Sequence, residues 1–219
     1  MKKKEIIKDY KKKIHQFKKF NQAYYNKDKP IVSDAEFDLI KLELIDLERK
    51  FDYLKSEFSP STSVGFKPSK NFKKVSHKVP MLSLGNAFKE EDLQNFEKKI
   101  FNFLNKSKEF ILEYSVEPKI DGISASLTYK DGNFIRGLSR GDGKIGEDIT
   151  DNLKTIQDIP LKVLANNFPK EIEIRGEVFI QNSDFIKLKD KFANPRNAAS
   201  GSLRQKESKE TKKIPLKFI

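Results

Sequence analysis

The chain has 219 residues, a formal net charge of +12 and no cysteine. That length accommodates one full domain with a smaller one, or two modest domains. The lack of cysteine excludes disulfides, thiolate catalysis and any Cys-ligated zinc site within the chain. No apolar run approaches the ~20 residues of a membrane span, and the start lacks the apolar centre of a secretory signal. We therefore expect a cytoplasmic protein with no membrane partner.

The positive charge is concentrated at the start of the chain. Residues 1–20 hold nine lysines against Glu5 and Asp9, so 9 − 2 = +7 of the net +12 lies there. Such a balance predicts attraction to polyanions, with nucleic acid the commonest partner and an anionic membrane surface the rival. Lysine enrichment in an AT-rich genome is an equally open interpretation, in which much of this charge is only a solvated helix face.

Two amphipathic helices are predicted in residues 1–55, as a small helical domain. The first carries one apolar stripe at spacings of three and four, formed by Ile6, Ile7, Tyr10, Ile14 and Phe17. The second begins at Ser33, where S-x-x-E makes a capping box with Glu36. Its apolar positions repeat with a period near 3.5, at Phe37, Ile40, Leu44, Leu47 and Phe51. Residues 24–32 join the two helices.

Residues 56–80 are rich in Pro, Ser and Lys, which is typical of a linker or an ordered loop. A third helix is predicted over 89–104, with Leu93, Phe96, Ile100 and Phe103 on one face. After it the period changes to two, which predicts strands at 110–117 and 123–129. Asp131-Gly132 predicts a type I′ hairpin turn, from which residues 134–140 return antiparallel.

Further elements follow along the chain. We expect a short helix over 147–156, a strand over 171–180, a helix over 183–191 and a helix over 198–204. Helices mixed with antiparallel strands indicate an α+β fold.

Lys119 is the first candidate for chemistry. It precedes a glycine turn between two predicted strands, with Glu117 and Asp121 on either side. A lysine must lose its proton to act as a nucleophile, against a reference pKa of ~10.4, so such a site has to desolvate it or surround it with cations. In a lysine-rich chain, K-x-D-G is equally compatible with an ordinary lysine before a turn.

Four other stretches carry a functional and a structural interpretation. Glu173, Arg175 and Glu177 share one strand face, which would bind a polar ligand or only solubilise an edge. Arg140-Gly141-Asp142-Gly143 would approach a phosphate closely, or simply close a turn.

The other two are helix starts. Small residues between Arg196 and Arg204 allow close packing against a neighbour or a phosphate backbone, with Arg196 just before the helix N-terminus. The acidic residues after Ser33 complement the helix dipole, or with Tyr24 and Tyr25 hold a cationic ring. His15 and His77 have no second ligand at metal spacing.

Seven motifs in fixed order resemble one family. They are V-S-D-A-E-F-D, S-P-S-T-S-V-G, H-K-V-P-M-L-S-L-G-N-A-F, E-P-K-I-D-G, R-G-D-G-x-x-G-E-D-I-T-x-N, R-G-E-V-F and F-A-N-P-R-N-A-A-S-G-S-L-R-Q. Together they closely resemble the N-terminal third of bacterial NAD-dependent DNA ligases, over nearly all of residues 15–219.

The resemblance implies a helical nicotinamide-mononucleotide-binding domain at 1–55, a linker at 56–80 and part of a nucleotidyltransferase (adenylation) domain at 81–219. Lys119 would accept AMP from NAD, release nicotinamide mononucleotide and pass the AMP to the 5′-phosphate of nicked double-stranded DNA during replication and repair. The family also uses magnesium, for which the resemblance names no ligand here.

The resemblance also implies binding residues. Those near the adenosine would be Ser83, Leu84, Glu117, Arg140 and Glu177, and Asp121 would be a further cofactor-binding residue. Those near the nicotinamide mononucleotide would be Tyr24, Tyr25, Asp34, Ala35, Glu36, Phe37 and Asp38. Arg196 and Arg204 would contact phosphate or DNA.

Three departures from the family pattern limit what is expected. Phe37 stands where the family usually has Tyr, and the segment between Phe179 and Phe192 is shorter by roughly half a dozen residues. The sequence ends before the family's two later lysine motifs and its remaining domains. We therefore expect exposed strand edges and apolar faces, marginal stability, and no nick sealing by this chain alone unless a second polypeptide supplies the rest.

Two rival hypotheses remain. One is a non-catalytic, basic nucleic-acid-binding remnant of a ligase. The other is a different lysine-adenylating enzyme that uses ATP, against which the segment from Tyr24 to Asp38 argues, because an ATP user has no nicotinamide to hold.

Overall fold

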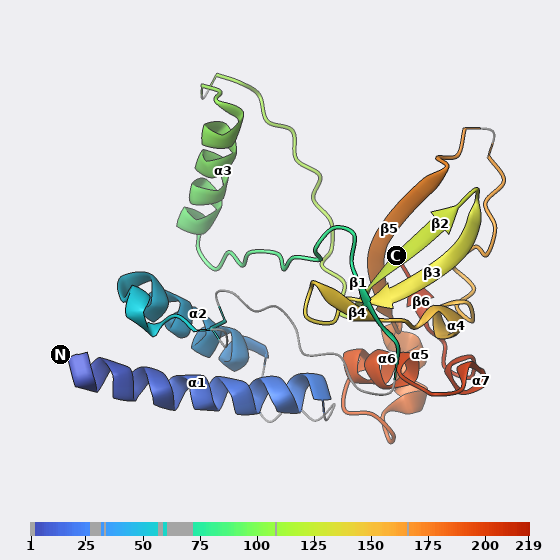
Figure 1. Ribbon diagram of the computed structural model, residues 1–219, viewed down its shortest axis with the longest axis horizontal. Helices are drawn as coiled ribbons and strands as arrows, with labels where there is room; N and C mark the ends of the chain where they lie inside the picture. The colour runs from blue at the N-terminus through green and yellow to red at the C-terminus, as the bar shows by residue number, and fades with distance from the viewer. Residues whose placement is uncertain are drawn as a thin grey trace. The chain divides into compact units, whose positions relative to one another are not determined.

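The computed structural model describes residues 3–26, 32, 34–56, 59–60, 72–107, 109–165 and 167–219. Helices come first and antiparallel strands later, which confirms the α+β prediction (Figure 1). The chain divides into two compact units, one formed by Met1–Met81 with Ile120–Ile219 and the other by Leu82–Lys119. None of the helices in the described ranges is long and apolar enough to cross a membrane.

Helices α1 (Lys3–Asn26) and α2 (Asp34–Lys50) pack through the predicted apolar stripes. Phe17 stacks on Phe37 with ring centroids 5.2 Å apart, and Leu44 is fully buried. A 3₁₀ turn, η1 (Asp52–Leu54), adds Leu54 to this cluster. Helix α1 continues to Asn26, so Tyr24 and Tyr25 belong to its last turn and not to the connection predicted from the sequence. The predicted capping box starts at Ser33, which lies outside the described residues.

A buried polar contact ties α1 to α2. The Tyr10 hydroxyl donates to Glu48 Oε1 at 2.6 Å, and the hydroxyl oxygens of Tyr10 and Ser59 lie 3.5 Å apart. Glu48 and Ser59 are both fully buried. Burial, reinforced by the hydrogen bond to Glu48, raises the pKa of Tyr10 to about 12.

The main sheet is antiparallel and has the strand order β3-β2-β5-β6. Its strands are β2 (Ile123–Lys130), β3 (Asn133–Ser139), β5 (Glu171–Phe179) and β6 (Lys217–Phe218). The hairpin turn is confirmed, because Asp131 has φ 48° and Gly132 has φ 77°, the two positive angles that a type I′ turn needs. A Cβ on Gly132 would lie 2.5 Å from the Val163 carbonyl oxygen, so glycine is needed there for space as well. A second, two-stranded sheet pairs β1 (Lys74–Ser76) with β4 (Ile145–Glu147).

One face of the main sheet forms the core. Leu127 and Tyr129 of β2 and Val178 of β5 are buried on this face with Leu153 of α4 (Thr150–Leu153). Helix α6 (Pro195–Leu203) adds Ala198 and Ala199, which are both fully buried. The small residues of α6 therefore serve close packing, one of the two interpretations that the sequence left open. Short elements complete the chain: α5 (Asn182–Phe185), η2 (Ile186–Leu188) and α7 (Ser208–Thr211).

The unit Leu82–Lys119 contains α3 (Glu90–Leu104), which confirms the third predicted helix. Asp92 accepts hydrogen bonds from the backbone N–H groups of Phe88 and Lys89, and these bonds lower the pKa of its carboxyl group. Leu93, Phe96 and Phe103 on the predicted apolar face are 58%, 55% and 89% exposed. The apolar side of α3 is therefore largely exposed.

Several predicted elements are wrong or shifted. Residues 110–117 form no strand, so Lys119 does not lie in a turn between two strands. The helix predicted over 147–156 is limited to Thr150–Leu153, because Glu147 is taken up by β4. The helix predicted over 183–191 splits into α5 and η2.

Candidate active site

The second face of the main sheet is polar. Strand alternation places Glu173, Arg175 and Glu177 of β5 on it, as predicted. The register sets Ser124 opposite Glu177, Ser126 opposite Arg175, and Thr128 opposite Glu173. The strand that follows the K-x-D-G motif therefore supplies hydroxyl groups beside the charges of β5.

Ser124 links two of the predicted binding residues. Its hydroxyl donates to Glu177 Oε2 at 2.8 Å, and its carbonyl oxygen accepts from the Arg140 N–H at 3.2 Å. The Glu177 backbone pairs with Ile219 through bonds of 2.9 and 3.2 Å, which fixes that position of the strand. Sequence reasoning missed Ser124 as a site residue, although its polar position three residues after Asp121 was visible in the alternation.

Arg175 forms hydrogen bonds with the backbone of Val79 and Pro80, which precede Ser83 and Leu84 in the chain. Its guanidinium donates to the carbonyl oxygens of Val79 at 2.5 Å and Pro80 at 3.0 Å, and its Nε to Glu173 at 2.8 Å. Next along the chain, Met81 is 5% exposed and donates its N–H to the Gly143 carbonyl at 2.8 Å. Ser83 and Leu84 belong to the other unit, where both are exposed.

The glycine-rich stretch Arg140–Gly143 forms the turn between β3 and β4. Gly141 has φ 58° and Gly143 has φ 88°, and a Cβ on Gly141 would lie 1.9 Å from the Ile145 carbonyl oxygen. Asp142 Oδ1 accepts from the N–H groups of Lys144 and Ile145, and the Arg140 carbonyl accepts from the Gly143 N–H at 3.0 Å. These glycines thus meet the needs of the turn itself. The His77 Nε2 also lies 3.1 Å from the Arg140 carbonyl oxygen, which gives His77 a structural contact.

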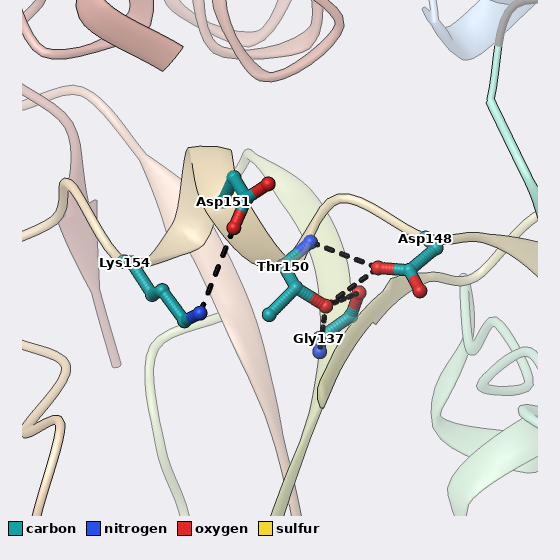
Figure 2. Close-up of polar contacts among 5 residues, drawn as sticks. All are labelled: Gly137, Asp148, Thr150, Asp151 and Lys154. Atoms are coloured by element: carbon teal, nitrogen blue, oxygen red, sulfur yellow. Dashed lines mark hydrogen bonds and ion pairs between the residues drawn. The ribbon is translucent and has the colours of Figure 1, made fainter. Parts of the chain in front are cut away.

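Asp148 and Thr150, later in the same motif, are structural (Figure 2). Asp148 Oδ1 accepts from both the N–H and the hydroxyl of Thr150, at 3.2 and 2.5 Å. The Thr150 hydroxyl oxygen also accepts from the Gly137 N–H at 2.9 Å, which joins the start of α4 to β3. Asp151 and Lys154 add an ion pair of 3.6 Å across α4.

Two residues of the same motif, Glu147 and Asn152, contact Arg204 and the residues on either side of it. Its Nε lies 3.3 Å from Glu147 Oε2, and the Glu147 side chain is only 1% exposed against 34% for Arg204. The Asn152 side-chain amide donates to the carbonyls of Leu203 and Gln205, at 2.7 and 2.9 Å. The residues on both sides of Arg204 are therefore held by one side chain, and its guanidinium by a buried carboxylate.

The K-x-D-G motif is anchored at its last two residues. Asp121 Oδ1 accepts from the Arg196 guanidinium at 3.1 Å. A Cβ on Gly122 would lie 2.2 Å from the Val178 carbonyl oxygen, so only glycine allows this approach to β5. Arg196 lies inside the first turn of α6 and not before it, because Asn194 caps the helix by accepting from the Asn197 N–H at 2.7 Å.

Lys119 and Glu117 lie in the unit Leu82–Lys119, where both are exposed. Glu117 Oε1 accepts from the Ser115 hydroxyl at 3.1 Å. Lys119 precedes Asp121 by two residues, in a stretch without regular secondary structure.

The predicted nicotinamide-mononucleotide residues are at the end of α1 and the start of α2. Glu36 is exposed, Asp38 is half-buried, and Phe37 is 7% exposed against Phe17. The ring of Phe37 is therefore part of the helix packing. For four other predicted residues, only the helix to which they belong is described. They are Tyr24, Tyr25, Asp34 and Ala35.

Comparison with family models matches almost the whole chain. Residues 3–65 match the model "DNA ligase-like, N-terminal NAD+-binding domain". Residues 69–219 match the model "NAD-dependent DNA ligase adenylation domain".

Individual relatives agree with these matches. The chain is 69% identical to a DNA ligase of Pelagibacter ubique over 216 residues, which cover 99% of the chain and 32% of that relative. It is 47% identical to a DNA ligase of Parvibaculum lavamentivorans, over 93% of the chain and 30% of the relative. It is 50% identical to a DNA ligase of Rickettsia bellii, over 91% of the chain and 30% of the relative. The chain thus spans about a third of the length of the curated relatives it matches.

Proposed function

The chain belongs to the NAD-dependent DNA ligase family, and from this premise we propose that it forms the NAD-binding and adenylation part of such a ligase. Residues 1–55 bind the nicotinamide mononucleotide half of NAD, residues 56–80 are a linker, and residues 81–219 form part of the adenylation domain. The boundary between the two family matches, at 65–69, supports this division.

Lys119 is the nucleophile of the proposed reaction. Its Nζ, as the neutral amine, attacks the α-phosphorus of the AMP half of NAD. A P–N bond forms, the P–O bond to nicotinamide mononucleotide breaks with its electron pair leaving on that oxygen, and the Nζ proton goes to solvent. The lysine then holds AMP. A 5′-phosphate oxygen of nicked DNA forms a P–O bond to this AMP, the P–N bond breaks, and the lysine nitrogen takes a proton from solvent to restore the free amine. A DNA 3′-hydroxyl displaces AMP in the sealing step.

The anchoring of the K-x-D-G motif is the observation that carries this proposal. Asp121 is bonded to Arg196, and Gly122 approaches β5 more closely than any other residue could. These two contacts fix the backbone that follows Lys119, and a nucleophile has to be held in place in this way to attack efficiently. The two-residue step from Lys119 to Asp121 spans at most about 7 Å, so an anchored Asp121 restricts the lysine strongly.

The polar face of the sheet supplies acceptors for the adenosine. In this proposal Glu177, held by Ser124, accepts from a ribose hydroxyl or the adenine amine, and Arg140 offers a planar donor fork. Ser83, Leu84, Glu117 and Asp121 are the further residues that we assign to NAD binding. At the start of α2, Asp34, Ala35, Glu36, Phe37 and Asp38, together with Tyr24 and Tyr25, are the residues that we assign to the nicotinamide mononucleotide half.

The family's magnesium is not assigned to side chains of this chain. Among the residues that the structure describes, no three His, Asp or Glu side chains gather closely enough to hold a metal ion.

Intact-mass measurement after incubation with NAD and magnesium tests the proposal. We expect a gain of one adenylyl group by the chain and no gain by Lys119→Ala. Lys130→Ala is a matched control, because Lys130 is exposed on β2 and should keep the gain. A chain that gains nothing but still binds DNA would support the non-catalytic basic remnant instead.

A further inference from the structure

The exposed side of α1 carries a continuous basic face. Projected at about 100° per residue, its members fall within roughly 120° of the helix circumference. They are Lys4, Lys8, Lys11, Lys12, His15, Lys18 and Lys19, and every one of them is exposed. We call this set the α1 basic face.

The positions of the acidic residues argue that this face does not result from random lysine enrichment. Helix α1 has eight lysines and two acids, 8 − 2 = +6, whereas α2 has three basic and six acidic residues, 3 − 6 = −3. The acids of α1, Glu5 and Asp9, lie outside the basic face. Lys13, which also lies outside it, pairs with Glu43 of α2 at 2.5 Å. A drift toward lysine would not sort charges by helix and by face in this way.

The geometry of the face suits a nucleic-acid duplex. From Lys4 to Lys19 it extends over about 22 Å, at 1.5 Å per residue. A DNA duplex presents a phosphate charge every ~1.7 Å of its axis, or about 13 charges over that length. Six lysines along one face of a helix can therefore contact several phosphates at once without contacting any base.

The apolar side of α1 argues against a lipid partner. A helix that binds a membrane surface inserts its apolar side between the lipids. Here Tyr10 and Phe17 are 6% and 7% exposed, because that side packs against α2. Only charge is offered to a partner, which favours a polyanion in water.

We propose that the α1 basic face binds the phosphate backbone of duplex DNA without sequence preference, as a contact separate from Arg196 and Arg204. It adds a DNA-binding role to a helix pair whose proposed task is to hold the nicotinamide mononucleotide. DNA held there would raise the local concentration of the substrate that receives AMP.

The test compares two variants of the full chain with equal net charge. In the first, Lys4, Lys8, Lys11, Lys12 and Lys19 are changed to Gln, which forms helices about as well as Lys. In the second, the same change is made at Lys50, Lys98, Lys99, Lys189 and Lys212, which are exposed elsewhere. Both reduce the net charge from +12 to +7. None of these ten lysines forms an ion pair within the described residues.

Affinity for a fluorescent duplex is measured from 50 to 300 mM salt. Each phosphate that the protein no longer neutralises should reduce the slope of log K against log salt by about 0.9, so we expect the slope of the first variant to fall by about 3 to 4. The slope of the second should fall by less than about 1. Thermal unfolding checks that both variants remain folded.

Other outcomes overturn the proposal. Equal reductions of the slope in the two variants would show that net charge alone drives binding. An unchanged DNA slope with abolished binding to phosphatidylserine vesicles would assign the face to a membrane. Adenylation by NAD, measured by mass in the absence of DNA, should be the same in the first variant and the parent chain. A loss there would show that the basic face also serves the reaction with NAD, which would contradict a role in DNA binding alone. The DNA titration decides the DNA contact independently.

Discussion

Residues 123–139 and residues 109–120 differ in how their backbones are hydrogen-bonded. The β2–β3 hairpin is paired on both sides of β2, with β3 and with β5. Residues 109–120 show a similar apolar alternation at Leu112, Tyr114 and Val116, yet within the described part of the chain their only backbone hydrogen bond is the turn bond from the Phe110 N–H to the Ser107 carbonyl. The difference shows that an apolar period of two is compatible with a strand, but that a strand forms only where a neighbouring strand supplies backbone hydrogen bonds.

Burial follows the same division. In the hairpin, Leu127 is 2% exposed and Tyr129 is 1% exposed. In the other segment, Ile111 is 83% exposed and Val116 is 92% exposed. Substitutions in the hairpin should therefore change the free energy of unfolding, and matched substitutions in residues 109–120 should not.

Leu127→Ala should have the largest effect. It removes a side chain buried among Tyr129, Val178 and other core residues, at an expected cost of about 2–5 kcal/mol in the free energy of unfolding. Urea unfolding followed by circular dichroism measures it. A loss below about 1 kcal/mol would mean that this face of the sheet is not the core.

Gly132→Ala should come next, at about 1–3 kcal/mol, because the positive φ strains any other residue. The added Cβ would also meet the Val163 carbonyl oxygen at 2.5 Å. Gly85→Ala is the control in the unit Leu82–Lys119, since nothing lies within 4 Å of a Cβ there. Equal effects of the two substitutions would contradict the described turn.

Tyr129→Phe should cost about 1 kcal/mol at neutral pH, because the hydroxyl donates to the Pro160 carbonyl at 2.8 Å. Burial raises the pKa of Tyr129 above 10.0. A raised pKa in the folded state gives stability that is complete below pH 10 and is lost as the pH rises through the folded value. The parent chain should therefore lose more stability above pH 10 than the Phe variant does. Parallel pH curves for the two proteins would contradict the buried tyrosine.

Val116→Ala should have the smallest effect, within about 0.5 kcal/mol of the parent chain. The side chain is 92% exposed, so its truncation removes little packing. The same urea experiment checks this value. A cost near that of Leu127→Ala would reveal a partner for residues 109–120 and erase the difference between the two regions.

The sequence was sufficient to predict an element where that element and the segment it packs against lie close together in the chain. The turn at Asp131-Gly132 fixes the register of β2 and β3, and the stripes of α1 and α2 face each other across a short connection. It was insufficient where the partner was distant. Alternation at 110–117 could not show that no strand of the described chain pairs with it. Glu147 is read as the start of a helix until its pairing with Lys74 is known.

The candidate site shows the same limit. Motif order located the K-x-D-G lysine and the charges of β5. The link from Ser124 to Glu177 needed a strand register that joins residues 53 positions apart. The ion pair of Arg204 with Glu147, and the hydrogen bonds from Asn152 to the backbone on either side of Arg204, could not be predicted because each joins residues more than 50 positions apart. From the motif, Arg204 was interpreted as a phosphate or DNA contact. In the structure, part of its role is the ion pair with Glu147 of a distant segment.

The pairing of Arg204 with Glu147 also constrains how the family can vary. A carboxylate that is 1% exposed cannot lose its cation without a large desolvation cost, and the arginine alone would lose its support. The two positions should therefore change together among homologues, with a neutral residue at 147 accompanied by a neutral residue at 204. Because Asn152 holds the backbone on both sides of Arg204, such paired changes should be possible without remodelling the end of α6.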